Sequence, residues 1–292
     1  MDGYKLVMDV SHHVRLNYDL VKKYVDGFII RFGFGIDVDT VSEQHYNGLK
    51  DKPCAGYQWF RPDQDIKMQI ELVKQRVGDK NIKVFFSDQE QKGVYNVSTS
   101  TYSPDLLSER GRAHVEGLAL HGFDMGVYSR ATWVSQYAKP MLSWLPNYHN
   151  WLASWPYASG AVNTTWEYLM SFWAPKTFSP YYTADFLQAH RVAKAWQWSG
   201  DKFIVPGVTT STGIPRSSDF NFVRDDLFER FKGAPVVAPP PVVVPDPIIE
   251  NTYNELGYLI TSMLAGKLAI DERLLKDITE AVEIRKLMKP GG

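Results

Sequence analysis

Short runs of strand-forming residues recur along the first part of this chain, over about 220 residues, and helix-forming segments separate most of the early runs. Several runs are apolar at consecutive positions, as in Phe28-Ile29-Ile30, which is the pattern of strands buried on both faces of a parallel sheet. The eight predicted strands are Lys5–Val10, Phe28–Phe32, Ala55–Phe60, Lys83–Asp88, Gly126–Tyr128, Trp151–Ser154, Ala195–Trp198 and Ser218–Phe220. Because the later intervals are less regular than the early ones, the pattern predicts an irregular, TIM-like (β/α) barrel of the α/β class.

The segments between the predicted strands carry helix signals. Asp63 is placed to cap a helix whose apolar residues recur at helical spacing, at Ile66, Ile70, Val73 and Val77. Ser103-Pro104-Asp105 combines an N-cap residue, a proline and an acidic first turn, and therefore predicts another helix start. A doubly wound open sheet is the competing fold, but no glycine-rich phosphate loop follows the first predicted strand.

The charge balance and the single cysteine limit the classes of partner and compartment. The 292 residues include 32 basic and 33 acidic side chains, so a near-neutral chain gives no electrostatic reason to expect nucleic acid or an anionic membrane as a partner. Cys54 is the only cysteine, which rules out a disulfide within the chain and is compatible with a reducing cytoplasm. Met1-Asp2-Gly3-Tyr4-Lys5 lacks the pattern of a secretory signal, and no apolar run reaches the roughly 20 residues that span a bilayer.

Composition changes sharply after residue 233 and divides the chain into three predicted parts. Residues 1–233 form the barrel, and residues 234–247 form a linker whose six prolines favour a semi-rigid, extended conformation. Residues 248–292 form a small helical tail, with a short heptad seam in its first helix and an apolar stripe in its second. The seam is Ile249, Tyr253, Leu256, Ile260 and Met263, and the stripe is Leu275, Ile278 and Val282.

Four carboxylates are predicted to meet at one end of the barrel. In a parallel barrel the functional groups lie at the carboxyl ends of the strands, where Asp9, Asp88, Glu90 and Asp219 are found. The first and eighth strands are neighbours in a closed barrel, so Asp9 and Asp219 are expected to lie close together. Asp88 and Glu90 are two residues apart, which on a strand places both on one face with their Cα atoms about 6.6 Å apart. Crowded carboxylates raise one another's proton affinity, as a general acid that works near neutral pH requires.

The sequence around Asp88 resembles a known family. Phe85-Phe86-Ser87-Asp88-Gln89-Glu90 is similar to the strand-end Asp-x-Glu of the family 25 glycoside hydrolases, the lysozymes that act as N-acetylmuramidases. Further similar segments keep the family's order over residues 4 to about 231, and they are Met8-Asp9-Val10-Ser11, Phe28-Ile29-Ile30-Arg31-Phe32-Gly33-Phe34-Gly35, Gly56-Tyr57-Gln58-Trp59-Phe60, Gly126-Val127-Tyr128-Ser129, Trp151-Leu152-Ala153, Ala195-Trp196-Gln197-Trp198 and Ser218-Asp219-Phe220-Asn221. Two features depart from the family pattern: Gln58 stands where the family usually has histidine, and residues 91–103 form a polar insert.

The resemblance implies a role for each carboxylate. Glu90 would be the general acid, and Asp88 would stabilise positive charge or orient the substrate's acetamide. Asp9 and Asp219 would be supporting carboxylates that bind sugar and tune the pKa of Glu90. Because Asp88 and Glu90 share one strand face, their spacing favours a substrate-assisted mechanism over an enzyme nucleophile. No cofactor and no metal are expected.

Several aromatic residues at the predicted strand ends are candidates for sugar stacking, because Trp and Tyr faces bind sugar rings. They are Tyr57, Tyr128, Trp151, Trp155 and Trp198, and burial in the barrel core is the alternative role for each. Arg31 is the sixth candidate for substrate contact; its charge inside a barrel needs a partner, so it is alternatively a structural partner of Asp9.

These features together predict a peptidoglycan hydrolase that cleaves the β-1,4 bond between N-acetylmuramic acid and N-acetylglucosamine, as a phage endolysin does. Such a protein would be made in the bacterial host cytoplasm without a signal peptide, would act on the cell wall, and would have peptidoglycan as its partner. The tail would form a homo-oligomer or bind the wall.

Two alternatives remain at the level of sequence. One is a non-catalytic wall-binding or virion structural protein built on the same barrel. The other is a metal-dependent hydrolase of cell-wall glycan that uses His12-His13 with the nearby carboxylates, although their spacing fits no standard zinc motif.

Overall fold

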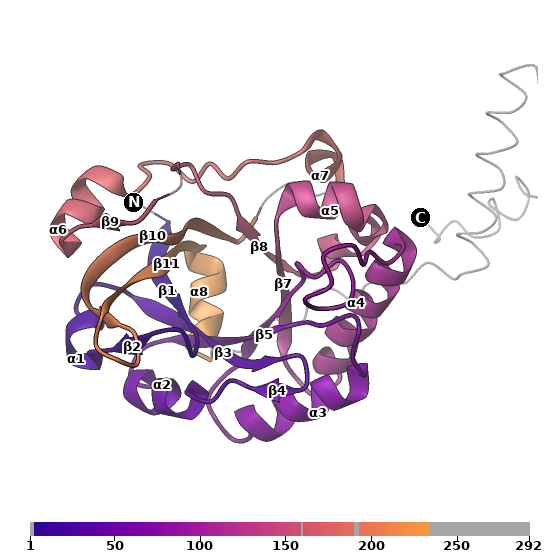
Figure 1. Ribbon diagram of the computed structural model, residues 1–292, viewed down its shortest axis with the longest axis horizontal. Helices are drawn as coiled ribbons and strands as arrows, with labels where there is room; N and C mark the ends of the chain where they lie inside the picture. Colours follow the sequence, from indigo (N-terminus) through magenta and orange to yellow (C-terminus); the bar gives the residue numbers. More distant parts are fainter. Residues whose placement is uncertain (1–2, 159, 190–192, 234–292) are drawn as a thin grey trace, which may run out of the picture. The chain divides into compact units, whose positions relative to one another are not determined.

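The computed structural model describes residues 3–158, 160–189 and 193–233. The predicted linker and helical tail, residues 234–292, lie outside the described residues. The described part confirms the predicted α/β fold, an irregular TIM-like barrel (Figure 1).

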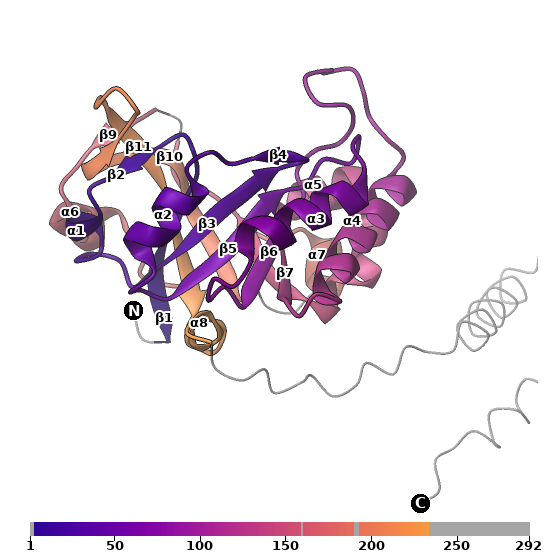
Figure 2. The same cartoon turned by 90° about the horizontal axis from the view of Figure 1, so that it is seen from below.

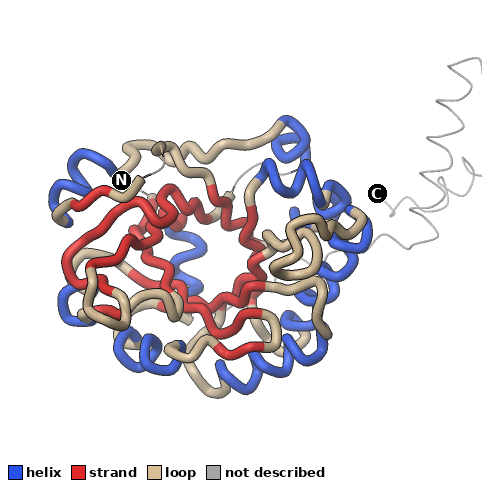
Figure 3. Tube along the Cα trace, in the orientation of Figure 1, coloured by secondary structure: helices blue, strands red, loops and turns tan. Residues whose placement is uncertain are grey.

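Eight strands close the barrel, and each coincides with a predicted strand. They are β1 (Tyr4–Val10), β3 (Gly27–Phe34), β5 (Cys54–Trp59), β6 (Val84–Asp88), β7 (Asp124–Ser129), β8 (His149–Ala153), β10 (Ala195–Thr209) and β11 (Pro215–Arg224). The sheet closes because β1 pairs with β11 on one side and with β3 on the other. Figure 3 shows the strands as a ring with helices around its outside.

The last strand runs in the opposite direction to the other seven, which corrects the prediction of an all-parallel barrel end. β11 is antiparallel to both β1 and β10. Only residues 210–214 join β10 to β11, and such a short connection permits a hairpin but no crossover helix. Asp219 therefore lies in the first half of an antiparallel strand, and it reaches the same end of the barrel as Asp9, its register partner.

Helices cover the outside of the barrel, and one helix closes its lower end. The outer helices are α1 (Tyr18–Val21), α2 (Ser42–Leu49), α3 (Ile66–Val77), α4 (Pro104–Ala119), α5 (Ala131–Tyr137), α6 (Trp166–Tyr168) and α7 (Ala184–Ala189), with short 3₁₀ turns at Lys139–Ser143 and Leu145–Asn147 and a π turn at Leu169–Trp173. Three two-residue strands, β2 (Arg15–Leu16), β4 (Asp37–Val38) and β9 (Val162–Asn163), extend the sheet beside β3 and β10. α8 (Asp225–Phe231) lies at the end where β1 begins (Figure 2).

One predicted helix cap is confirmed and one is wrong. Ser103 caps α4, with its side chain accepting a hydrogen bond from the Leu106 amide. The cap of α3 is Asp65, not Asp63. Asp63 instead forms an ion pair with Arg61, which holds it in the loop before the helix.

Strand pleating divides the apolar side chains between the barrel interior and the outer layer under the helices. The interior set includes Val7, Ile29, Tyr57, Phe86 and Trp151, and Leu227, Phe228 and Phe231 of α8 pack below it. The interior is therefore filled and closed at the α8 end, which leaves the opposite end for a binding site. No helix in the described part of the chain is long and apolar enough to cross a membrane.

Candidate active site

Asp88 and Glu90 project from the end of β6 on one side of the strand. Gln89, between them, faces outward, where its amide donates hydrogen bonds to Ser87 Oγ at 3.0 Å and to the Gly111 carbonyl at 3.1 Å. Asp88 is buried, whereas the Glu90 side chain is 21% exposed. The strand thus presents one enclosed and one accessible carboxyl group at the open end of the barrel.

Asp9 is held by two amide side chains from the neighbouring strands. Its Oδ2 accepts hydrogen bonds from Asn221 Nδ2 at 2.8 Å and from Gln197 Nε2 at 3.1 Å. The Tyr128 hydroxyl donates to Gln197 Oε1 at 2.8 Å, and Trp151 Nε1 donates to Asn221 Oδ1 at 2.7 Å. Tyr128 and Trp151 are therefore buried positioning residues that reach Asp9 through Gln197 and Asn221.

Asp219 faces Asp9 across the β1–β11 pair. One of its carboxyl oxygens accepts a hydrogen bond from the Asp201 amide at 2.6 Å. Asp201 has a φ of 51°, in the left-handed region that non-glycine residues rarely adopt. The irregular part of β10 around Asp201 thus adopts an uncommon backbone conformation at the position whose amide binds Asp219.

Burial raises the pKa of all four carboxyl groups, and repulsion between the crowded carboxylates, the predicted cause, adds to this effect. The pKa of Asp9 rises to about 6, because desolvation outweighs its hydrogen bonds from Asn221 and Gln197. The pKa values of Asp88 and Asp219 are raised well above the usual range by desolvation, with further contributions from Glu90 at Asp88 and from Asp9 at Asp219. Desolvation also raises the pKa of Glu90, while the positive charge of Arg130 opposes the increase.

In the free protein the surroundings favour a proton on Asp88 over a proton on Glu90, whereas the sequence analysis assigns the proton of the general acid to Glu90. Asp88 is more deeply buried, and its Oδ1 has no hydrogen-bond partner among the described residues. Glu90 is partly exposed and has Arg130 Nε at 3.8 Å from its Oε2. Both differences favour the charged form at Glu90, and the two groups titrate as a pair.

Arg31 pairs with a residue that was not predicted. Its Nε donates to Asp39 Oδ2 at 2.8 Å, and both side chains are buried. The alternative of Asp9 as the structural partner of Arg31 is therefore wrong. Asp39 also accepts a hydrogen bond from the His12 amide at 3.0 Å, so one carboxylate joins β3 to the loop after β1.

Trp198 lies outside the site, which corrects its prediction as a sugar contact. Side chains alternate along β10, and the inward position of Gln197 turns Trp198 outward. Its side chain has no exposed surface and stacks on Phe220 and Phe222, with ring centres 5.7 and 5.6 Å apart. Tyr57 does face the interior, where its ring meets the edge of Trp151.

The exposed aromatic of the site is Trp155, directly after β8, and beside it lies Arg130, which the sequence analysis missed. Trp155 is 43% exposed, and its Nε1 donates to Gln197 Oε1 at 3.0 Å. The Arg130 guanidinium lies 4.1 Å from the centre of the Trp155 ring and also approaches Glu90. Arg130 immediately follows the end of β7, and that place at a strand end is the signal that could have identified it.

Gln58, the departure from the family's usual histidine, lies behind the site. It faces outward and is fully buried; its Nε2 donates to the Gly35 carbonyl at 2.7 Å, and its Oε1 accepts a hydrogen bond from His114 Nε2 at 2.8 Å. Burial lowers the pKa of His114 to about 3, so this histidine is neutral. Gln58 therefore links β5 to α4 through His114, while Tyr57 occupies the inward position.

The two histidines of the alternative metal site lie on the Asp39 side of the barrel mouth. Their rings are 3.9 Å apart, and His12 Nδ1 contacts Arg31 and Asp39. Within the part of the chain that the structure describes, no three His, Cys, Asp or Glu side chains converge as metal ligands.

Comparison with known proteins places this barrel among the family 25 lysozyme structures. No family model and no curated protein matches the sequence. The structure is similar to the CTP1L endolysin (TM-score 0.55, 16% identity, 78% of this chain and 70% of that chain) and to a family 25 lysozyme from Aspergillus fumigatus (TM-score 0.55, 18% identity, 78% and 98%). It is also similar to the modular autolysin LytC from Streptococcus pneumoniae, solved with a synthetic peptidoglycan ligand (TM-score 0.52, 19% identity, 76% and 47%). At these identities the likeness establishes the fold: the chain has the barrel of the family 25 lysozymes.

Proposed function

We propose that this protein is a peptidoglycan hydrolase that cleaves the β-1,4 bond between N-acetylmuramic acid and N-acetylglucosamine. The observation that carries the proposal is the convergence of Asp9, Asp88, Glu90 and Asp219 at the open end of the barrel, with pKa values raised by burial. Glycoside hydrolysis needs a carboxyl group that keeps its proton near neutral pH and a second carboxyl group beside the developing positive charge. The lysozyme-like fold supports the same reaction.

In the proposed mechanism Glu90 donates its proton to the leaving glycosidic oxygen, because it is the accessible member of the pair. The carbonyl oxygen of the substrate's N-acetyl group forms a bond to the anomeric carbon as the glycosidic bond breaks. Asp88 orients the acetamide and stabilises the positive charge that develops on it. That charge favours ionised Asp88, so the shared proton moves to Glu90 as the reaction proceeds. Water then opens the intermediate and gives a proton to the Glu90 carboxylate.

The surrounding residues divide into contact and positioning roles. Trp155 offers exposed ring surface for a sugar beside Arg130, and the buried Tyr57 and Arg31 lie close to Asp88. Tyr128 and Trp151 act through Gln197 and Asn221, as their hydrogen bonds indicate. We propose that Asp9 and Asp219 bind sugar hydroxyls and keep the pKa of Glu90 high.

We also propose that the protein acts as a phage endolysin, made in the host cytoplasm and acting on the wall. The similarity to a structure described as an endolysin supports this context, and the peptidoglycan ligand of LytC supports the substrate class. The tail, which lies outside the described residues, would join copies of the chain or bind the wall.

Replacement of the proposed acid tests the reaction. Glu90→Gln keeps the size and hydrogen bonding of the side chain but removes the proton donor, so release of reducing ends from purified peptidoglycan should fall by about 100-fold or more. Glu109→Gln, an exposed substitution on α4, is the matched control and should retain wild-type activity. Near-normal turnover by a folded Glu90→Gln protein would refute the assignment of roles.

A further inference from the structure

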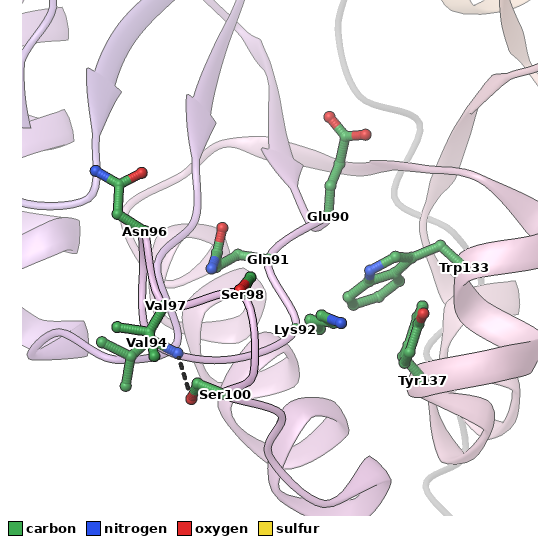
Figure 4. Close-up of a pocket in the computed structure, with 10 residues that line it drawn as sticks. All are labelled: Glu90, Gln91, Lys92, Val94, Asn96, Val97, Ser98, Ser100, Trp133 and Tyr137. Atoms are coloured by element: carbon green, nitrogen blue, oxygen red, sulfur yellow. Dashed lines mark hydrogen bonds between the residues drawn. The ribbon is translucent and has the colours of Figure 1, made fainter.

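A pocket of about 360 Å³ opens beside Glu90 and is not used by the mechanism above. The polar insert supplies one wall, with Lys92, Asn96 and Ser100, and α5 supplies the other, with Trp133 and Tyr137 (Figure 4). The pocket therefore lies between the segments that follow β6 and β7, directly beside the proposed acid.

The insert is a built part of the barrel mouth. Ser100 Oγ accepts a hydrogen bond from the Val94 amide at 2.9 Å, as Figure 4 shows. The Tyr95 amide donates to Asp63 Oδ2 at 3.2 Å, and the Arg61 guanidinium lies 4.7 Å from the centre of the Tyr95 ring. These contacts fix the insert to the loop after β5, so the pocket wall has a defined position.

Two donors on the wall of the pocket, the Lys92 ammonium and the Trp133 indole N–H, have no acceptor among the described residues. Lys92 makes no ion pair with any carboxylate of the described residues; its ammonium lies 5.3 Å from the centre of the Tyr137 ring. Trp133 Nε1 is buried and has no acceptor within the described part of the chain. Glu90 points away from Lys92 in Figure 4. The pocket is thus lined by an ammonium group, an indole N–H and two aromatic rings. This combination suits a ligand group with negatively charged oxygen atoms.

We infer that this pocket binds a carboxylate carried by the glycan next to the bond that Glu90 protonates; the inference rests on the proposed function. Peptidoglycan offers that chemistry from two sources. One is the lactyl carboxylate of muramic acid where the peptide is absent, and the other is a carboxylate of the stem peptide. The Lys92 ammonium and the Trp133 N–H donate to the carboxylate oxygens, and the rings cover the adjoining apolar atoms.

Binding measured without turnover separates this inference from the reaction. The Glu90→Gln protein is titrated by calorimetry with an N-acetylglucosamine hexamer, with amidase-treated glycan strands that carry lactyl carboxylates, and with strands that carry stem peptides. Lys92→Met, added to that protein, should weaken binding of a carboxylate-bearing strand about tenfold more than binding of the hexamer, as expected for loss of a charge-assisted hydrogen bond. Trp133→Phe, which removes the N–H donor and part of the ring, should act in the same direction.

The pattern of losses identifies the source of the carboxylate. A loss with amidase-treated strands assigns the lactyl group, and a loss confined to peptide-bearing strands assigns the stem. The control is Lys23→Met, which changes an exposed lysine that precedes β3 at the opposite end of the barrel. The inference would be overturned if the Lys92→Met and Lys23→Met proteins bound each type of glycan strand with equal affinity. It would also be overturned if neither type of glycan strand bound. If binding depends on Lys92 but the wild-type protein releases no reducing ends, the proposed reaction would be refuted and the inference about the pocket would stand.

Discussion

Burial raises the pKa of Glu90, and two charged neighbours modify that pKa: Arg130 lowers it and Asp9 raises it. Asp9 contributes repulsion between like charges, and Arg130 contributes attraction from 3.8 Å. Because a general acid works only while protonated, the rate should fall as the pH rises through the raised pKa of Glu90. The two neighbours therefore set the alkaline limb of the pH–rate profile from opposite sides.

Neutral replacements of these neighbours should move that limb in opposite directions. Asp9→Asn removes the repulsion and should shift the limb to lower pH, whereas Arg130→Met removes the attraction and should shift it to higher pH. Profiles of kcat/KM on soluble glycan strands measure both shifts. Shifts of the same sign, or none, would show that these residues are not electrostatic neighbours of the acid.

Asp9 should also make the stability of the protein depend on pH. Its pKa is about 6 when folded against 3.8 for the ordinary side chain, so between these values the folded state binds more protons than the unfolded state. Raising the pH through this window therefore destabilises the folded state, by about 3 kcal/mol above pH 7. Asp9→Asn, whose oxygen can accept the same two hydrogen bonds, should stabilise the protein at pH 7.5 and have little effect at pH 3.5. Urea unfolding at both values measures this, with exposed Asp79→Asn as the control; equal effects of Asp9→Asn at both pH values would contradict it.

The sequence predicts the identity of residues at the site better than their orientation. Asp9, Asp88 and Glu90 follow from their places at strand ends, whereas Asp219 lies within β11 and reaches the site because that strand is antiparallel. Pleating puts Asp88 and Glu90 on one side because they are two residues apart. In the run Ala195–Trp198 every residue except Gln197 is apolar or aromatic, so hydrophobicity does not show which side chains face inward. Gln197, as the one polar residue of this run, indicates the inward side, and its neighbour Trp198 therefore faces outward. Arg130 could have been identified from its place directly after β7, whereas Asp39 follows from no residue pattern, because its role depends on its ion pair with Arg31.

At the scale of elements, all eight barrel strands could be located from their apolar runs, but the direction of β11 could not. An apolar run has the same appearance in a parallel and an antiparallel strand. The short connection at residues 210–214 carries the information, because a parallel return needs a dozen or more residues. The caps show a similar limit: Asp63 and Asp65 are both suitable N-cap residues, and the ion pair of Asp63 with Arg61 decides between them.

Contact between β6 and α4 should be sensitive to one added methyl group. A Cβ at Gly111 would lie 2.2 Å from Gln89 Oε1, so Gly111→Ala must displace Gln89, between the proposed catalytic pair. We expect a destabilisation of about 1–3 kcal/mol and a lower kcat. Gly117→Ala on the same helix is the control, because its Cβ would meet mainly the mobile end of Ile70. Thermal unfolding and activity measure both effects, and an unchanged Gly111→Ala protein would show that the contact does not hold the strand end.

At the scale of the whole molecule, the barrel is complete before the predicted linker begins. β1 starts at Tyr4, and α8, which packs against the lower end of the interior, ends at Phe231. A chain that ends at Gly233 should therefore fold and keep its activity on soluble glycan strands. Light scattering should give a monomer for this shortened chain and a larger assembly for the full chain, if the heptad seam joins copies. A monomeric full chain would remove the oligomer proposal and favour a tail that binds the wall.

The identity of the bond that is cut tests the central claim most directly. Purified peptidoglycan is digested with the full-length protein, with and without EDTA, and the soluble products are identified by mass spectrometry after borohydride reduction. The proposed mechanism predicts muramic acid at the new reducing ends, and a rate that EDTA leaves unchanged, since its steps use carboxyl groups, the substrate's N-acetyl group and water. Reduced N-acetylglucosamine, free acetate or new amino termini among the products, or a rate abolished by EDTA, would contradict it.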